Sequence, residues 1–254
     1  MLDIATGNAA LPQLLVSARG ADPASLPRID AVDLATIQPA WLARLIAPVR
    51  ERLNVQGGIA AEALPFADHS FDLVVSQYGI EYSDLARSAA EVVRVRKAGG
   101  TVALVLHHQD SLPVRLGRAE VAHIDWLLAA GGLLDRARRL VPFLARLATP
   151  AGAASVQRDP DATRARTRFN ESMRALELRV QADAAPDLLL EMQEAVGRVL
   201  AETSRVGERA ARERLQSLAD GLAEARLRQA ELVEHALDRA GVERLVSLLQ
   251  PAPG

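Results

Sequence analysis

The chain has 254 residues, a formal net charge of −2, an aromatic content of 3% and no cysteine. The absence of cysteine excludes disulfides, thiolate metal sites and a cysteine nucleophile, and we assign no residue to a metal. The near-neutral charge and the scarcity of aromatic rings argue against nucleic acid as a partner. Because no apolar run reaches the roughly 18 residues of a membrane helix, we expect a cytoplasmic protein that does not bind a membrane.

Up to about residue 110, short apolar runs alternate with stretches of helical length. The clearest runs lie within Phe71–Ser76 and Thr101–His108, and their lack of polar alternation is typical of strands buried on both faces. Three further strands are predicted over Met1–Ala5, Ile29–Leu34 and Val55–Ala60. Helices are predicted over Ala9–Arg19, Pro39–Arg52 and Ser83–Lys97. Strand and helix in alternation indicate an α/β fold with a doubly wound, mostly parallel, Rossmann-like sheet.

From about Leu112 to Ala240 the pattern is helical. Leu215, Leu218 and Leu222 recur at helical spacing with Arg and Glu between them, which predicts amphipathic helices with solvated, salt-bridged faces. The alternative is a coiled coil that binds a partner or joins two copies into a homodimer. The predicted organisation is a cofactor-binding domain over residues 1–110, a helical cap inserted over 111–240 and a final strand over 241–254.

The helical segment follows the run that ends at His108, so it leaves the sheet at the carboxyl edge, where a doubly wound sheet binds ligands. Pro142, Pro150 and Pro186 divide the segment into pieces. We therefore expect a hinged lid over the site. At the far end, Gly241 predicts a helix stop, and Glu243–Leu249 predicts the strand that returns to the sheet.

The segment Leu2-Asp-Ile-Ala-Thr-Gly-Asn-Ala-Ala10 joins an apolar run to a predicted helix through small residues. Small residues let a ligand approach the backbone, and the helix start offers free N–H groups. A second acid, Asp33, closes the next apolar run. An acid at the end of the second strand is the usual acceptor for ribose hydroxyls, whereas the alternative for Asp33 is a helix N-cap.

Taken together, these segments resemble the class I S-adenosylmethionine-dependent methyltransferases, especially the small-molecule branch. Four more stretches, in the family's order, carry the resemblance: Ala61–Phe66 followed by Asp68–Asp72, Leu73–Gly79, Glu91–Gly100 and His107-His108. The sequence departs from the family pattern at Ala5 and Ala9, where glycine is usual, and at Ala60, where an acid is common.

The resemblance implies S-adenosylmethionine as the cofactor and a small molecule as the methyl acceptor. Asp3 and Gly7 would lie at the methionine end of the cofactor, and Asp33 would hold the ribose. Leu34, Ala61 and Glu62 would lie at the adenine, while Ser76 and Gln77 would close the site beside the reactive methyl group. The implied cofactor-binding residues are Asp3, Ala5, Gly7, Asn8, Asp33, Leu34, Ala61, Glu62, Ser76 and Gln77.

His107 and His108 end the fifth predicted strand beside the expected cleft, so they are the candidate catalytic bases for an acceptor that must lose a proton. Strand alternation sends only one of them inward, and the alternative is a pair of solvated histidines. Tyr78 and Tyr82 are candidates to shape the acceptor pocket, or else they serve packing.

Two other functions stay open. A nicotinamide-dependent oxidoreductase requires Gly-x-Gly-x-x-Gly, but the chain offers only Ala5-x-Gly7-x-x-Ala10. A degraded methyltransferase domain that acts as a helical interaction protein would fit the departures at Ala5, Ala9 and Ala60. Because the first predicted strand begins at Met1, the sequence indicates either a chain clipped at both ends or a minimal version of the fold.

Overall fold

The computed structural model describes residues 1–19 and 23–250, which fold into two units. The first unit takes Met1–Ser111 and His235–Gly254, and the second takes Leu112–Glu234. In the described ranges, no helix combines the length and the apolar character that a membrane span requires.

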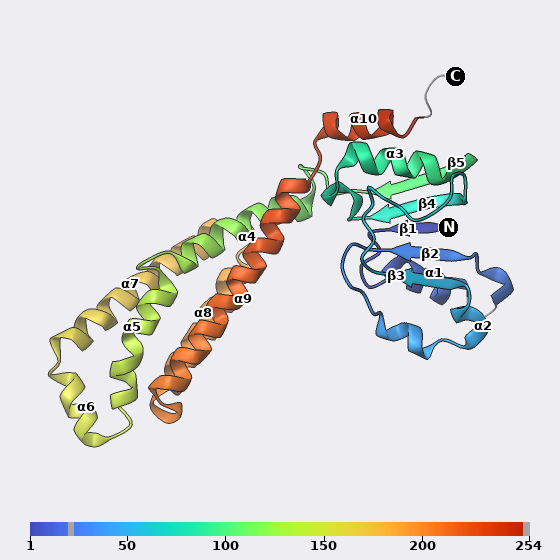
Figure 1. Cartoon of the computed structure of the whole chain (residues 1–254). Coiled ribbons are helices and arrows are strands. Elements are labelled where there is room, and N and C mark those ends of the chain that lie inside the picture. The colour runs from blue at the N-terminus through green and yellow to red at the C-terminus, as the bar shows by residue number, and fades with distance from the viewer. Residues whose placement is uncertain (20–22, 251–254) are drawn as a thin grey trace. The chain divides into compact units, whose positions relative to one another are not determined.

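The first unit contains a sheet of five parallel strands in the order β3-β2-β1-β4-β5 (Figure 1). The strands are β1 (Leu2–Ile4), β2 (Ile29–Val32), β3 (Leu53–Gln56), β4 (Phe71–Gln77) and β5 (Arg96–Val105). The chain runs outward from β1 to β3, then returns to the other side of β1 for β4 and β5. The strand order therefore reverses beside β1, and the carboxyl ends of β1 and β4 flank this switch point.

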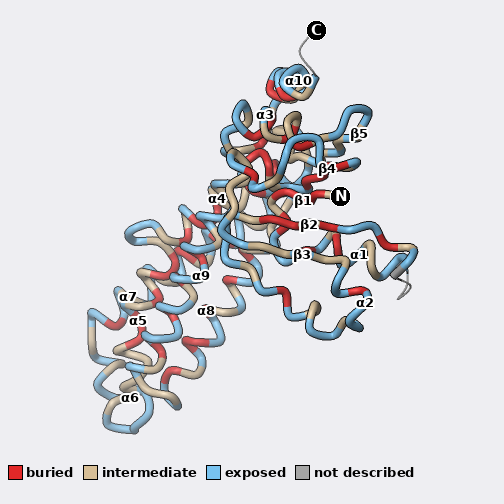
Figure 2. Tube along the Cα trace, turned by 45° about the vertical axis from the view of Figure 1, so that its right-hand side comes forward, coloured by how far each residue is buried: buried red, intermediate tan, exposed pale blue. Residues whose placement is uncertain are grey.

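Helices α1 (Ala10–Arg19) and α3 (Leu85–Val95) cover opposite faces of this sheet. Val74 of β4 is buried in the same cluster as Val92 of α3, whereas Leu73 lines a cavity with leucines of α1. Because neighbouring strand residues point to opposite faces, the two helices lie on different sides. This confirms the α/β, doubly wound fold. The buried core of the unit, red along β1 and β2 in Figure 2, consists of Leu2, Ile4, Val32, Leu64, Phe71, Val74, Ile80, Val92 and Val95.

The long helix expected over Pro39–Arg52 is wrong. A short 3-10 segment, Ala40–Arg44, is followed by the single-turn helix α2 (Ala47–Arg50). Pro48 lacks the N–H that a continuous helix needs, and it lies in the first turn of α2, where that N–H is not required. Ile46, which precedes this helix, is extended with ψ 146°. The third strand consequently forms earlier than expected, in register with β2 through Leu53 and Ile29.

The final strand expected over 241–254 is also wrong, because residues Arg239–Leu248 form helix α10. The side chain of Asp238 caps this helix by accepting a hydrogen bond of 2.7 Å from the N–H of Gly241. Leu245 and Leu249 are four residues apart and therefore lie on the same side of the helical segment, which packs against apolar residues of the first unit. Leu237 forms an isolated parallel bridge with His108, beyond the end of β5 and outside the strands of the sheet. Residues 251–254 lie outside the described residues.

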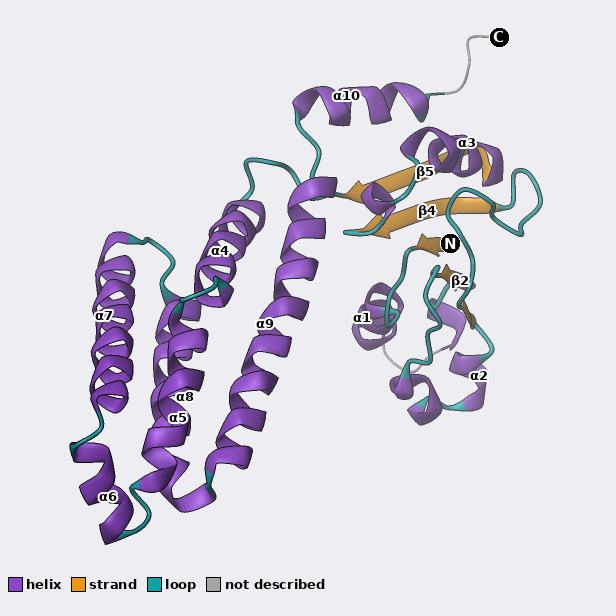
Figure 3. Cartoon of the chain, turned by 60° about the vertical axis from the view of Figure 1, so that its left-hand side comes forward, coloured by secondary structure: helices purple, strands orange, loops and turns teal. Residues whose placement is uncertain are grey.

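The second unit is a helical bundle (Figure 3). Its helices are α4 (Leu112–Leu128), α5 (Leu133–Arg146), α6 (Pro150–Gln157), α7 (Pro160–Ala182), α8 (Asp187–Val206) and α9 (Glu208–His235), whose last residue belongs to the first unit. Pro150 lies in the first turn of α6 and Pro186 precedes α8, but Pro142 lies inside α5 and does not divide it. Leu215 and Leu222 of α9 are buried in this unit's own core.

Candidate functional site

A cavity of about 350 Å³ lies in the first unit, at the carboxyl ends of β1, β2 and β4. It is lined by Ala5, Gly7, Asp33, Leu34, Ile59, Ala60, Ala61, Glu62, Tyr78, Gly79, Tyr82 and Ser83. Because the strand order reverses between β1 and β4, this is the place where an open α/β sheet binds its ligand.

The turn after β1 has the backbone of a glycine-rich loop although it contains alanines. Ala5, Gly7 and Ala9 all adopt left-handed conformations, with φ of 56°, 55° and 57°. For an alanine this conformation costs about 1–2 kcal/mol, so the surrounding contacts must hold it. The N–H of Thr6 donates to the carbonyl of Val32 (3.0 Å), and the indole N–H of Trp41 donates to the carbonyl of Asn8 (3.0 Å).

Asp33 links the ends of β1 and β2. Its carboxylate accepts hydrogen bonds from the N–H of Gly7 (2.7 Å) and of Ala35 (2.9 Å), one on each oxygen. No described helix begins at Asp33, so the N-cap interpretation is wrong, and the bond to Ala35 closes an Asx turn. Each oxygen keeps a further lone pair, which suits a ligand with two neighbouring hydroxyls. Leu34 beside it is 72% exposed on the cavity wall.

Asp3 lies beneath the turn and is not part of the cavity wall. Its side chain is buried, Oδ2 accepts a hydrogen bond of 2.5 Å from the Thr6 hydroxyl, and Oδ1 has no partner among the described residues. The pKa of Asp3 is raised to about 6, because burial and, to a smaller extent, the nearby charge of Asp33 outweigh the opposing effect of the Thr6 hydrogen bond. An orphaned, desolvated acid at this position favours a ligand with a positive charge.

Four of the expected cofactor residues, Asp3, Asn8, Ser76 and Gln77, do not line the cavity. Ser76 is buried and its Oγ accepts a hydrogen bond of 3.2 Å from the N–H of Ile80, which fixes the chain just after β4. Glu62 does line the cavity, but its Oε1 accepts the N–H of Asp84 at 2.9 Å at the start of α3.

The segment that carries Ala61 and Glu62 is held by Arg94 of α3. Its guanidinium donates to the carbonyls of Leu64 (3.0 Å) and Phe66 (2.7 Å) and pairs with Glu91 (2.7 Å). The hydrogen bond from Arg94 lowers the pKa of Glu91, and the bond from the N–H of Leu64 lowers it further, against partial desolvation. This network fixes one wall of the cavity.

The two candidate histidines have different surroundings. The side chain of His107 is 12% exposed, and its Nδ1 lies 2.8 Å from Oε1 of Glu81. The His107 ring also stacks on Tyr78, with 4.4 Å between ring centroids. The side chain of His108 is 41% exposed, and its Nδ1 accepts a hydrogen bond from the N–H of Asp110. The geometry distinguishes the two: His107 is the embedded one.

Sequence reasoning missed Glu81, which is fully buried, and did not assign Gly79 and Ser83 to the site. The sequence did contain a signal for Glu81, because a carboxylate four residues beyond a strand rich in apolar residues is expensive to bury without a partner. Nothing in the spacing of Glu81 and His107 shows, however, that the ends of β4 and β5 would bring them together.

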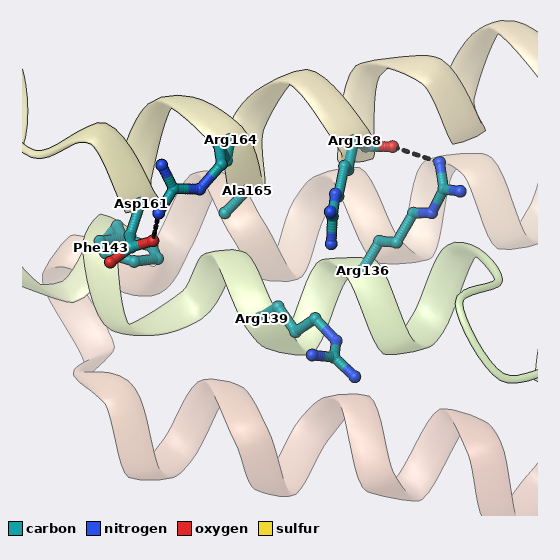
Figure 4. A pocket seen from close by; sticks show the side chains of 7 residues that line it. All are labelled: Arg136, Arg139, Phe143, Asp161, Arg164, Ala165 and Arg168. Carbon is teal, nitrogen blue, oxygen red and sulfur yellow. Dashed lines mark hydrogen bonds and ion pairs between the residues drawn. The ribbon is translucent and has the colours of Figure 1, made fainter.

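A second polar cavity, of about 220 Å³, lies between α5 and α7 in the helical unit and is lined by four arginines (Figure 4). Three of these have a carboxylate partner: Arg136 with Glu171, Arg139 with Asp135 and Arg164 with Asp161. Most of the positive charge is thus balanced by the helices themselves, and we assign no ligand to this cavity. In the described part of the chain, no group of three or more His, Asp and Glu side chains could hold a metal ion.

Strand order, turn and cavity together form the arrangement in which open α/β sheets bind their ligands. The family described as "Methyltransferase domain" matches residues 2–104. Over these residues the chain is similar to that family. The uncharacterized methyltransferase YcgJ of Bacillus subtilis (strain 168) is 40% identical over 65 residues, which are 25% of this chain and 25% of that protein. The chain thus matches about a quarter of the length of this curated relative.

Solved structures of methyltransferases also resemble part of the chain. The YcgJ structure from Bacillus subtilis is 27% identical, covers 50% of each chain and has a TM-score of 0.32. A putative S-adenosyl-L-methionine-dependent methyltransferase from Methanococcus maripaludis is 21% identical, with 49% of this chain and 56% of that chain covered and a TM-score of 0.35. A geranyl diphosphate C-methyltransferase from Streptomyces coelicolor A3(2) is 16% identical, with 42% and 38% covered and a TM-score of 0.34.

Proposed function

We propose that the first unit binds S-adenosylmethionine in the 350 Å³ cavity and transfers its methyl group to a small-molecule acceptor. The observation that carries this proposal is the arrangement at the switch point: Asp33 with a free lone pair on each oxygen, next to a left-handed turn at Gly7. If a Cβ were added to Gly7, no other atom would lie within 4 Å of it, so the space over this residue is open to a ligand.

The residues present fit the cofactor. Asp33 would hold the ribose diol through charge-assisted hydrogen bonds, and exposed Leu34 would be covered by the adenine. The buried charge of Asp3 would favour the cationic methionine end. S-adenosylmethionine supplies the activated methyl group on its sulfonium, so the protein has to align the acceptor, exclude water and take up a proton where the acceptor releases one.

The test is the affinity for S-adenosylhomocysteine, measured by calorimetry on the full chain. We expect Asp33→Asn to weaken binding by about 1.5–3 kcal/mol, the range for hydrogen bonds to charged groups, because the variant loses the charge and one acceptor oxygen. Asp30→Asn is the matched control on the same strand, since Asp30 contacts Asn54 and does not line the cavity.

Unchanged affinity in a folded Asp33→Asn variant would contradict the assignment of the ribose site. If the unaltered chain binds no S-adenosylhomocysteine at millimolar concentration, the degraded-domain alternative is favoured, and binding of NAD instead would favour an oxidoreductase. A cytoplasmic location, the lack of nucleic-acid binding and pairing of two copies through the helices stay predictions from the sequence.

A further inference from the structure

Glu81 carries a buried charge in the first unit that cofactor binding does not use. Its side chain is completely buried, and it follows β4 in a short 3-10 turn over Ile80–Tyr82. Oε1 accepts the backbone N–H of His107 (3.1 Å) and contacts Nδ1 of the same residue (2.8 Å). Oε2 has no hydrogen-bond partner among the described residues. Burying a carboxylate with one unpaired oxygen costs free energy, so we looked to its contact with His107 for a functional reason.

The contact fixes the protonation pattern of the His107 ring. Because Oε1 already accepts the backbone N–H of His107, the contact suits a ring that donates from Nδ1 to the same oxygen. A neutral imidazole with its hydrogen on Nδ1 has a free lone pair on Nε2. In the described residues Nε2 makes no hydrogen bond, and the ring keeps 12% of its surface exposed. His107 is thus prepared to accept a proton at Nε2.

Two tyrosines connect this histidine to the cavity. Tyr78 stacks on the His107 ring at 4.4 Å, and Tyr82 meets it edge-on at 6.5 Å. Both tyrosines line the 350 Å³ cavity. Tyr78 has a φ of 55°, a strained conformation for a tyrosine, and such strain is typically kept at functional sites. His107 thus contacts two residues of the cavity wall and is not itself one of the lining residues.

We propose that Glu81 and His107 form a proton-accepting pair, with His107 as the general base and Glu81 as its positioning residue. The acceptor class that needs such a pair is a hydroxyl compound, a phenol or an alcohol, which is protonated at neutral pH. This inference rests on the proposed methyltransferase function and narrows its substrate class.

In this step the acceptor oxygen forms a bond to the methyl carbon while its proton passes to Nε2 of His107. The carbon–sulfur bond breaks, and its electron pair stays on sulfur. The products are a methyl ether, S-adenosylhomocysteine and an imidazolium whose new charge faces the Glu81 carboxylate. The proton later leaves His107 for solvent, so the pair returns to its starting state.

The first test does not depend on turnover. In the full chain, long-range ¹H–¹⁵N correlation spectra report the tautomer of each histidine ring, and the loss of one signal in His107→Gln assigns His107. We expect the Nδ1–H tautomer in the unaltered chain and in Glu81→Gln, whose amide oxygen replaces Oε1. In Glu81→Met the tautomer should shift to Nε2–H. An Nε2–H tautomer of His107 in the unaltered chain would overturn the proposal.

The second test compares acceptors that do and do not need a base. Phenols and thiophenols are the probes, because thiophenols ionise near neutral pH without help, and S-adenosylhomocysteine formation is measured. We expect His107→Gln to lower kcat on phenols by about 100-fold or more, with KM and the activity on thiophenols little changed. Glu81→Gln should have a smaller effect of the same kind, because it keeps the tautomer but loses the charge.

His69→Asn serves as the matched histidine control, since His69 precedes β4 and contacts only the carbonyl of Arg96 through its ring. Equal losses on phenols and thiophenols, a loss that follows His108→Gln instead, or turnover of thiophenols alone by the unaltered chain would each overturn the proposal. Calorimetry with S-adenosylhomocysteine separates this outcome from failure of the proposed function, because the Glu81 and His107 variants should keep the affinity of the unaltered chain.

Discussion

At the scale of a single residue, the buried carboxylate of Asp3 lowers the stability of the ligand-free protein but would attract a positively charged ligand. Its carboxyl group is buried beneath the turn after β1, and burial raises its pKa to about 6. The folded protein therefore holds the proton more tightly than the unfolded chain does. The free energy of unfolding consequently falls as the pH rises from 3.8, the ordinary pKa of an aspartate, to about 6, and it stays lower above that pH. A ligand with a positive charge would compensate for this loss.

Asp3→Asn should therefore stabilise the ligand-free protein near neutral pH, by about 2–3 kcal/mol, because it removes a desolvated charge. Urea unfolding at about pH 7.5 and at about pH 2.5 measures the effect, and the gain should vanish at the lower pH, where Asp3 is protonated in both states. Calorimetry of the same variant should show weaker S-adenosylhomocysteine binding. A gain in stability that persists at low pH would contradict the raised pKa.

At the scale of elements, the turns after β1 and β4 are built against each other. A Cβ placed on Gly79 would lie 2.4 Å from the Cβ of Ala5, which is too close for two methyl groups. Ala5 itself has a left-handed φ of 56°, and Tyr78 next to Gly79 has 55°. The strain of both turns is thus kept where the strands flank the cavity, and the missing side chain of Gly79 makes room for the methyl of Ala5.

A double-mutant cycle tests this dependence. Gly79→Ala alone should destabilise the fold by about 1–3 kcal/mol, as overpacking does, because its new methyl overlaps Ala5. In an Ala5→Gly background the nearest remaining atom is the carbonyl oxygen of Ala5 at 3.1 Å, so the cost should be smaller. Urea unfolding of the unaltered chain, the two single variants and the double variant gives the coupling free energy between the two positions. Additive effects, within about 0.5 kcal/mol, would show that the two turns are independent.

At the scale of the whole molecule, the chain divides its apolar surface between two cores. Leu215 and Leu222 of α9 are buried with residues of α4, α5, α7 and α8, and Leu218 packs against them. The leucine stripe is therefore satisfied inside the helical unit and requires no other surface, neither a second copy nor the sheet. A role of this unit as a lid over the acceptor stays a prediction.

Hydrogen exchange of the full chain, with and without S-adenosylhomocysteine and a phenol, tests the lid. If the helices close over a bound acceptor, amides of α4 or α9 should become more protected when both ligands are present, because opening then requires ligand release. Protection that changes with protein concentration and not with ligand would indicate a dimer. If hydrogen exchange in the helical unit changes neither with ligand nor with protein concentration, the helical unit takes no part in binding these ligands.

The sequence by itself determined the parallel α/β sheet, because short apolar runs alternate with stretches of helical length. The expected burial on both faces holds for the centre of β4 but is wrong for β5, an edge strand whose residues from Thr101 to Val105 are alternately exposed and half-buried. It also placed Asp33 and Gly7 at the cavity, since a strand-ending acid and a small-residue turn act through local geometry. It did not determine the end of the chain: Glu243–Leu249 is apolar enough for either strand or helix, and the Asp238 cap together with packing beside β5 selected the helix. Only the tertiary structure distinguished the surroundings of His107 from those of His108. That difference depends on Glu81, which is 26 residues from His107 in the sequence and reaches it only because β4 and β5 pair in parallel.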